Sequence, residues 1–204
     1  MAVKLVAVMT VLLLRACFAG ATTFRVSLSG EADFRSVQSA IDAACRSGGR
    51  DRVLVTIAPG TYHERLVIPR HAPPLTLQGA GVSARDVVLT YNLSASSVLE
   101  PMGRPVGTSG STSTLVQADD FRAERVTFEN AAGDVGQAVA LKIVGDRAVF
   151  SECHFLGWQD TLYIDGGRQL FVRCHIEGSV DFIFGRSTAL FEACSIHIRK
   201  RGFI

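Results

Sequence analysis

Two aspartates occupy the same position of an internal repeat. Asp160 follows Cys153 by seven residues, and Asp181 follows Cys174 by seven residues. Because the cysteines recur at one phase, the spacing predicts that the two carboxylates lie side by side on neighbouring coils, where both cannot ionise easily. Such a pair splits its protonation, so that one carboxylate stays an anion and the other keeps its proton near neutral pH. The pattern therefore predicts a nucleophile beside a general acid.

Two glutamines supply neutral donors near this pair. Gln159 directly precedes Asp160, and Gln137 lies in the preceding strand-rich segment. Their amide groups could converge on an oxyanion without adding charge. Aromatic residues that could stack on sugar rings flank the acids, namely Trp158, Tyr163, Phe182 and Phe184.

The same residue types also have structural explanations. Aspartates at turns commonly make local hydrogen bonds, and glutamines in a solenoid form ladders. Stacked carboxylates can bind cations or face water. Aromatic residues in β-rich segments are more often part of the core. Spacing alone leaves these alternatives open.

The repeat that carries the aspartates indicates a parallel β-helix. Residues 150–155, 171–176 and 191–196 each begin with Phe and place a cysteine at the fourth position, and a weaker copy at 123–128 places Val126 there. Short β-rich runs separated by turns correspond to one coil per repeat. Equivalent side chains would stack about 4.8 Å apart, with the Phe and Cys positions inside. An antiparallel sandwich is the structural alternative, but it would not return identical residues at the same phase.

The first residues differ from the rest of the chain. Residues 1–21 combine Lys4, an apolar run and the small-residue sequence Ala19-Gly20-Ala21, which together predict a secretory signal peptide. A membrane anchor would need about 20 apolar residues, and Arg15 interrupts the run. Residues 22–204 are then one domain, in which the apolar spacing over residues 33–45 predicts a short helix that caps the first coil.

Composition restricts the partners. The formal net charge of +2 and the scattered Lys and Arg residues argue against nucleic acid, and no membrane association is expected after signal removal. The basic residues of Ile198-Arg199-Lys200 are interpreted as a solvated face. His154 and His175 share a phase but lack a third ligand at useful spacing, so no metal site is expected. Four cysteines remain after signal removal, namely Cys45, Cys153, Cys174 and Cys194, and spacing does not choose among their three complete pairings.

Residues 157–163 (GWQDTLY) and 178–185 (GSVDFIFG) resemble the two signature segments of pectin methylesterases. Residues 137–141, 59–64 and 33–43 resemble further segments of that family, so the resemblance covers nearly all of residues 24–204. It implies a right-handed parallel β-helix. It also implies hydrolysis of galacturonate methyl esters to pectate and methanol, without a metal or organic cofactor.

The resemblance implies a role for each motif residue. Asp181 would attack the ester carbonyl, while Asp160 would protonate the departing methanol and later activate water against the acyl-enzyme anhydride. Gln137 and Gln159 would stabilise the oxyanion. Substrate contacts are expected at Thr114, Gln137, Trp158, Tyr163 and Phe182.

One family segment has no counterpart here. It reads Leu-Gly-Arg-Pro-Trp, and its Arg orients the nucleophile while its Trp contacts sugar. We therefore expect the chain to be incomplete at its C-terminus, so full activity of this form is not expected. The hypothesis is a secreted, monomeric enzyme of the extracellular cell wall that acts on methyl-esterified pectin, with a proteinaceous pectinesterase inhibitor as a candidate partner.

Other functions fit part of the same pattern. A non-enzymatic wall-polysaccharide binder would keep the aromatic groove without turnover. Pectin lyases and polygalacturonases share the β-helix, but they need Ca²⁺-binding acid clusters or a particular His motif that this sequence does not show.

Overall fold

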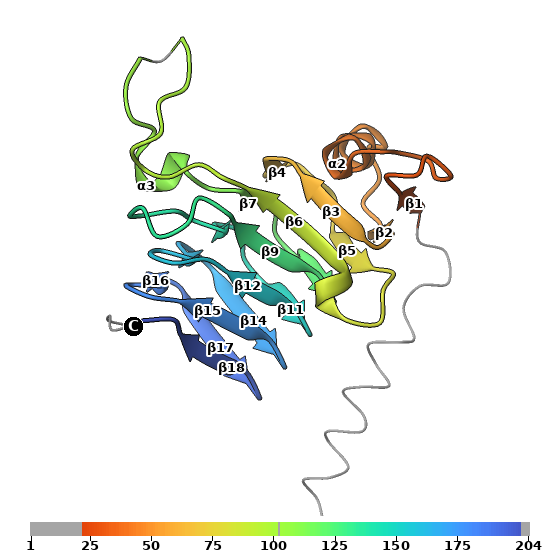
Figure 1. Cartoon of the computed structure of the whole chain (residues 1–204). Coiled ribbons are helices and arrows are strands. Elements are labelled where there is room, and N and C mark those ends of the chain that lie inside the picture. The colour runs from red at the N-terminus through yellow and green to blue at the C-terminus, as the bar shows by residue number, and fades with distance from the viewer. Residues whose placement is uncertain (1–21, 102, 201–204) are drawn as a thin grey trace, which may run out of the picture.

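The computed structural model describes residues 22–101 and 103–200. Within them the chain winds as a right-handed parallel β-helix, with 18 short strands in three parallel sheets and a short helix beside the first coil (Figure 1). The predicted fold class is therefore confirmed. The predicted signal peptide lies outside the described residues, within which no helix is both long and apolar enough to cross a membrane.

Each complete coil contributes one strand to each sheet, and every ladder is parallel. Sheet A contains β1 (Thr23–Val26), β2 (Val53–Ile57), β5 (Leu75–Gly79), β8 (Arg122–Glu124), β11 (Ala148–Ser151), β14 (Arg168–Val172) and β17 (Thr188–Glu192). Sheet B contains β3 (Gly60–His63), β6 (Val87–Tyr91), β9 (Thr127–Asn130), β12 (His154–Leu156), β15 (His175–Gly178) and β18 (Ser195–Ile198). Sheet C contains β4 (Leu66–Ile68), β7 (Thr114–Val116), β10 (Leu141–Ile143), β13 (Leu162–Ile164) and β16 (Ile183–Gly185).

The interior is built from ladders of like side chains. Phe150, Phe171 and Phe191 stack in consecutive strands of sheet A, with ring centroids 5.0 and 4.7 Å apart. Such stacks bury large apolar surfaces and add a specific aromatic contact. The predicted Phe ladder is therefore confirmed.

The cysteine ladder follows directly after the Phe ladder. The N–H of His175 donates to the carbonyl of Cys153 at 2.9 Å, and the N–H of His154 donates to that of Val126 at 3.1 Å. Val126 therefore occupies the cysteine position of its coil, as the repeat predicts. All four cysteines of the described residues are free thiols.

Left-handed residues turn the chain at the corners of the coil. Between sheets A and B they form a column with φ values of 51–54°, at Arg125, Glu152, Arg173 and Ala193. A non-glycine residue in this conformation is uncommon, because its Cβ crowds the backbone. Its recurrence on four successive coils gives these coils the same sharp bend.

The helix α2 (Val37–Arg46) covers the N-terminal end of the solenoid and contacts β1, β2 and β4. Its buried face consists of Val37, Ala40, Ile41 and Ala44. Glu64, which follows β3, accepts hydrogen bonds from the N–H groups of Val37 and Gln38 and from the hydroxyl of Ser36. A carboxylate at this end satisfies donors that the helix leaves free and matches the helix dipole.

The helix begins later than the apolar spacing predicts. Ser36 is the N-cap, and its hydroxyl accepts a hydrogen bond from the N–H of Ser39. Asp33 instead accepts a hydrogen bond from the N–H of Arg25, and Phe34 pairs with Val26 in a parallel bridge. The predicted start at residue 33 is therefore wrong, because residues 33 and 34 bond to the strand rather than to the helix.

Connections from sheet B to sheet C differ in length from coil to coil. They comprise residues 64–65, 92–113, 131–140, 157–161 and 179–182. The longest contains α3 (Gly107–Gly110) and projects from the solenoid (Figure 1). The buried side-chain amide of Asn130 holds it to the coil by donating to the carbonyls of Leu93, Ser111 and Val139. A short 3-10 turn at Ala84–Asp86 precedes β6.

Candidate active site

Asp160 and Asp181 lie at the corner between sheets B and C on neighbouring coils. The strands that follow them, β13 and β16, pair in parallel with Leu162 opposite Ile183. The N–H of Asp160 donates a hydrogen bond of 3.1 Å to the carbonyl of Val180, which joins the two corners directly. The two carboxylates therefore share one phase, as their spacing from the cysteines predicts.

Both aspartates hold a left-handed backbone conformation, with φ of 65° at Asp160 and 46° at Asp181. Aspartate tolerates this region better than most residues because its short polar side chain can bond locally. Residues held there cost about 1–3 kcal/mol each and tend to cluster at functional sites. The conformation recurs at equivalent positions of two successive turns.

The two carboxylates differ in their surroundings. Asp160 is only 6% exposed, whereas Asp181 is exposed. Burial, and secondly the nearby charge of Asp181, raise the pKa of Asp160 from 3.8 to about 6. Within the described part of the chain, no side chain or N–H donates a hydrogen bond to the Asp181 carboxylate. The geometry thus places a carboxyl group that retains its proton to higher pH beside an accessible one.

Gln137 and Gln159 lie side by side on neighbouring coils, one position before that of the two acids. They face each other in a parallel bridge, and the N–H of Ala138 donates to the carbonyl of Gln159 at 3.0 Å. Gln137 is exposed and Gln159 is half-buried. Neither side-chain amide has a hydrogen-bond partner among residues 22–101 and 103–200, so both can donate to a bound group.

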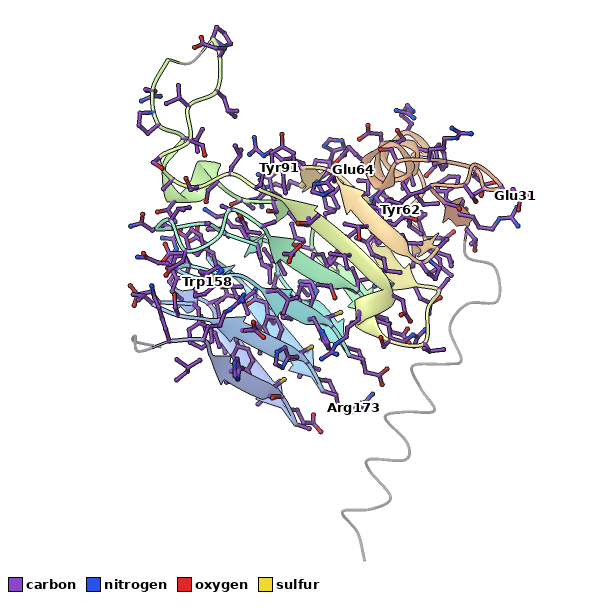
Figure 2. All side chains as sticks on the ribbon, in the orientation of Figure 1. Glu31, Tyr62, Glu64, Tyr91, Trp158 and Arg173 are labelled. Atoms are coloured by element: carbon purple, nitrogen blue, oxygen red, sulfur yellow. The ribbon has the colours of Figure 1, made fainter. Side chains whose placement is uncertain are left out.

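Two of the predicted aromatic contacts lie at the surface. Trp158 precedes the acid corner and is partly exposed, on the side of the solenoid where the turns before β13 and β16 lie (Figure 2). Tyr163 is the outward residue of β13 and stacks on Phe184 of β16, with centroids 4.3 Å apart and planes 18° apart. These rings form two apolar surfaces close to the carboxylates.

The structure places two of the predicted substrate contacts in the interior. Phe182 is fully buried and belongs to the hydrophobic core, because the bend at Asp181 turns its ring inward. Thr114 is 1% exposed, and its hydroxyl is buried with no partner in the described residues. It is the inward residue of β7, opposite the buried Leu141 of β10. Both side chains therefore face the interior here, and their contact with a polysaccharide stays a prediction.

The sequence reasoning missed an ion pair on the outer face of sheet C. Lys142 of β10 lies 3.0 Å from the carboxylate of Asp165 and 4.2 Å from the ring centroid of Tyr163. Asp165 also pairs with Arg186 at 3.1 Å. Burial raises the pKa of Asp165, but the hydrogen bond and charge of Lys142 outweigh this and lower it overall. The signal in the sequence was the position of Lys142 between two apolar residues of β10 that are both buried.

The interpretation of Ile198-Arg199-Lys200 as a solvated face is only partly right. The guanidinium carbon of Arg199 lies 4.1 Å from the ring centroid of Trp158, within range of a cation–π contact. Lys200 lies 5.8 Å from the same centroid and pairs with Asp134. Both cations therefore lie close to the ring before the acid corner.

A shallow groove of about 400 Å³ lies elsewhere, on the outer face of sheet B. Its lining includes Arg85, Glu129, His154, His175 and Glu177, and neither the paired aspartates nor the two glutamines. His154 and His175 lie with ring centroids 5.2 Å apart. No group of three His, Cys, Asp or Glu side chains in the described ranges could hold a metal ion. This groove therefore does not coincide with the candidate catalytic residues, which lie at the corner between sheets B and C.

Comparison with known proteins places this geometry in a family. The sequence model of the Pectinesterase family matches residues 23–202. The chain is 46% identical over 184 residues to Pectinesterase 31 of Arabidopsis thaliana, covering 88% of this chain and 57% of that protein. A pectin methylesterase structure from Erwinia chrysanthemi matches with a TM-score of 0.82 and 34% identity, over 90% of this chain and 57% of that one.

A further similar structure contains a carbohydrate. It is a pectin methylesterase variant in complex with a hexasaccharide, which matches with a TM-score of 0.81 and 34% identity over 90% of this chain and 57% of that chain. The chain thus spans somewhat more than half the length of these proteins. Since the family model extends over nearly all described residues, the chain belongs to the pectinesterase family.

Proposed function

We propose that this protein hydrolyses the methyl esters of pectin, giving methanol and free galacturonate carboxylates. The pair formed by Asp160 and Asp181 carries the proposal. One acid is buried with its pKa raised to about 6, and its exposed neighbour on the next coil is free to attack. A nucleophile beside a proton donor is what acyl transfer from an ester requires.

The first half of the reaction forms an acyl-enzyme. The Asp181 carboxylate attacks the ester carbonyl carbon, and charge develops on the carbonyl oxygen. The free amides of Gln137 and Gln159 donate hydrogen bonds to that oxyanion. As the tetrahedral intermediate collapses, the carbon–methoxy bond breaks and the proton of Asp160 passes to the departing oxygen. The products are methanol and a mixed anhydride between Asp181 and the galacturonate carboxyl group.

The second half returns the enzyme to its starting state. Asp160, now an anion, removes a proton from water, and the resulting hydroxide attacks the galacturonyl carbon of the anhydride. The anhydride bond breaks, which releases the galacturonate carboxyl group and restores Asp181 as a carboxylate. Asp160 again holds a proton, and the product carboxyl group loses its own to solvent.

Two partly exposed rings support a polysaccharide as the substrate. Trp158 and Tyr163 lie on either side of the acid corner along the chain, and aromatic faces suit the apolar faces of sugar rings. The proposed setting is the extracellular cell wall after secretion, with the enzyme acting as a monomer on methyl-esterified pectin. A proteinaceous pectinesterase inhibitor is the proposed protein partner.

The test is methanol release from highly methylated pectin. The full chain, with any residues that its gene encodes beyond Ile204, is compared with its Asp181→Ala variant and with Asp51→Ala, which alters an exposed carboxylate before β2. We expect Asp181→Ala to lower kcat by about three orders of magnitude or more. Asp51→Ala should retain the parental rate. An active Asp181→Ala protein would remove the nucleophile from the proposal.

The same preparation separates the esterase from a wall-polysaccharide binder. A binder would retain oligogalacturonides on Trp158 and Tyr163 but release no methanol. Binding without turnover by a folded full chain would therefore favour that second function.

A further inference from the structure

Arg199 contacts both turns that carry the candidate catalytic acids. Its backbone N–H donates to the carbonyl of Gly178 at 2.8 Å, in the segment that leads to Asp181. Its guanidinium stacks on Trp158 and donates from Nη1 to the carbonyl of Gly157 at 3.3 Å. Both groups belong to the segment that leads to Asp160. Through its backbone and its side chain together, this one residue of the following coil contacts the segments that lead to both acids.

A fourth contact fixes the direction of the guanidinium. Its Nε lies 3.2 Å from Oε1 of Glu177, which is the residue before Gly178. The side chains of Arg199 and Glu177 are 33% and 22% exposed, so water screens this pair less than a fully solvated one. A planar guanidinium can stack on a ring while its edge donates to a carbonyl and a carboxylate, which a lysine ammonium cannot reproduce.

The two corners also have contacts that do not depend on Arg199. The N–H of Ser179 donates to the carbonyl of Trp158 at 2.9 Å, and the N–H of Asp160 donates to that of Val180. These backbone bonds keep the coils in register. They leave the indole free to change rotamer, since a ring position is not set by its own carbonyl. Arg199, at 4.1 Å from the ring centroid, is the nearer of the two described cations over the indole, since Lys200 lies at 5.8 Å.

We propose that Arg199 is a positioning residue for the esterase reaction. It holds Trp158 in one orientation and thereby keeps the segment 157–160, with the general acid, aligned to the nucleophile turn and to the sugar bound on the indole. The inference rests on the proposed function. A displacement of about 1 Å at the reacting groups can cost about a hundredfold in rate, which is the scale at which such a contact matters.

Trp158 provides a readout that does not require activity. It is the only tryptophan in the 204-residue sequence, so the fluorescence difference between the parent and Trp158→Phe belongs to this indole. The experiment measures acrylamide quenching of that difference signal together with kcat and KM on methylated pectin. The variants are Arg199→Gln and Arg199→Lys in the full chain. Arg173→Gln is the matched control, because Arg173 pairs with Glu152 at the corner between sheets A and B.

The expected result is a combined change. Arg199→Gln should raise the quenching constant of Trp158 and lower kcat about ten- to a hundredfold. Arg199→Lys should recover part of both, since it keeps the charge but loses the planar stack. Arg173→Gln should change neither. If Arg199→Gln fails to fold by circular dichroism, Arg199→Lys alone decides, with a higher quenching constant and a lower kcat than the parent.

Two results would overturn the inference in a folded variant. One is a lower kcat with unchanged quenching, and the other is raised quenching with unchanged kinetics. If the parent itself releases no methanol, the proposed function fails instead. The parental rate thus distinguishes failure of the inference from failure of the function on which it rests.

Discussion

Asp160 and Asp181 occupy equivalent corners of neighbouring coils, yet Asp160 is 6% exposed and Asp181 is open to solvent. The same backbone conformation therefore presents two carboxyl groups in different environments. The burial of Asp160 raises its pKa to about 6 and gives the pair its asymmetry. The same burial means that the charged form of Asp160 destabilises the folded state.

The free energy of unfolding should reveal this cost through its pH dependence. Because the folded pKa of Asp160, about 6, lies above its ordinary value of 3.8, the folded state binds the proton more tightly. The associated stabilisation is complete below the ordinary pKa and is lost as pH rises through about 6. The shift corresponds to about 3 kcal/mol. Asp160→Asn should escape this loss.

Urea unfolding of the parent and of Asp160→Asn at roughly pH 4 and roughly pH 7.5 tests the sign. The variant should gain stability relative to the parent at the higher pH while losing esterase activity. Asp146→Asn is the opposite control. Arg168 lowers the pKa of Asp146 through a hydrogen bond, so its loss should destabilise the protein at neutral pH. Identical pH dependence in the parent and Asp160→Asn would contradict the assigned burial cost.

Removal of one amide donor should affect the transition state more than substrate binding. Gln137→Ala and Gln159→Ala are each expected to lower kcat by about 10²–10³, with a smaller change in KM. The reason is that the oxyanion, not the ester oxygen, carries the charge that these amides stabilise. Gln78→Ala is the control, since Gln78 lies on sheet A and bonds to Glu124 at 3.0 Å. A change confined to KM would assign the glutamines to binding.

The Phe ladder should carry a large share of the stability. Phe171 is fully buried between Phe150 and Phe191, and Phe155 meets its ring edge-to-face at 5.6 Å. Phe171→Ala leaves a cavity in this stack, with an expected loss of about 3–5 kcal/mol in the free energy of unfolding. Leu190→Ala on the neighbouring strand is the control, because Leu190 is 61% exposed. Equal losses in both variants would mean that the ladder does not stabilise the coil.

The ion pair of Lys142 and Asp165 should raise the free energy of unfolding at pH values above the ordinary pKa of aspartate. Lys142→Met leaves Asp165 with Arg186 as its partner, so the expected loss is about 1–3 kcal/mol, below that of a fully orphaned buried charge. Since Lys142 contributes to a lowered pKa of Asp165, its stabilising effect is present at neutral pH and disappears as pH falls through that lowered value. Unfolding curves of the parent and Lys142→Met at neutral and acidic pH measure the difference. A pH-independent loss would point to packing on Tyr163 instead.

Repeat spacing predicted the fold and the central pair because both depend on phase. The seven-residue offset from Cys153 and Cys174 places Asp160 and Asp181 on adjacent coils whatever their rotamers. The direction of a side chain in a three-residue strand, or directly before one, does not follow from the repeat spacing. Phe182 and Thr114 face the core, and nothing in their spacing distinguishes them from the outward Tyr163.

Side-chain contacts between coils also could not be predicted from the sequence. The stack of Arg199 on Trp158 joins residues 41 positions apart, and the choice of partner depends on side-chain rotamers rather than on phase. The burial of Asp160 likewise does not follow from its spacing, because Asp181 has the same spacing and is exposed. Sequence therefore indicated which carboxylates meet, while the structure was needed to tell which one is sheltered.

The connections from sheet B to sheet C have a consequence for specialisation within this architecture. The corner that carries Asp160 and Asp181 is short on their own coils, whereas the same corner two coils before Asp160 extends over residues 92–113. Because each coil bonds to its neighbours through its strands, a long excursion at one corner leaves the pitch of the next corner unaltered. Natural variation can thus lengthen or shorten the connections around the two aspartates, and so change which sugars flank the target ester. The positions of the aspartates themselves stay the same.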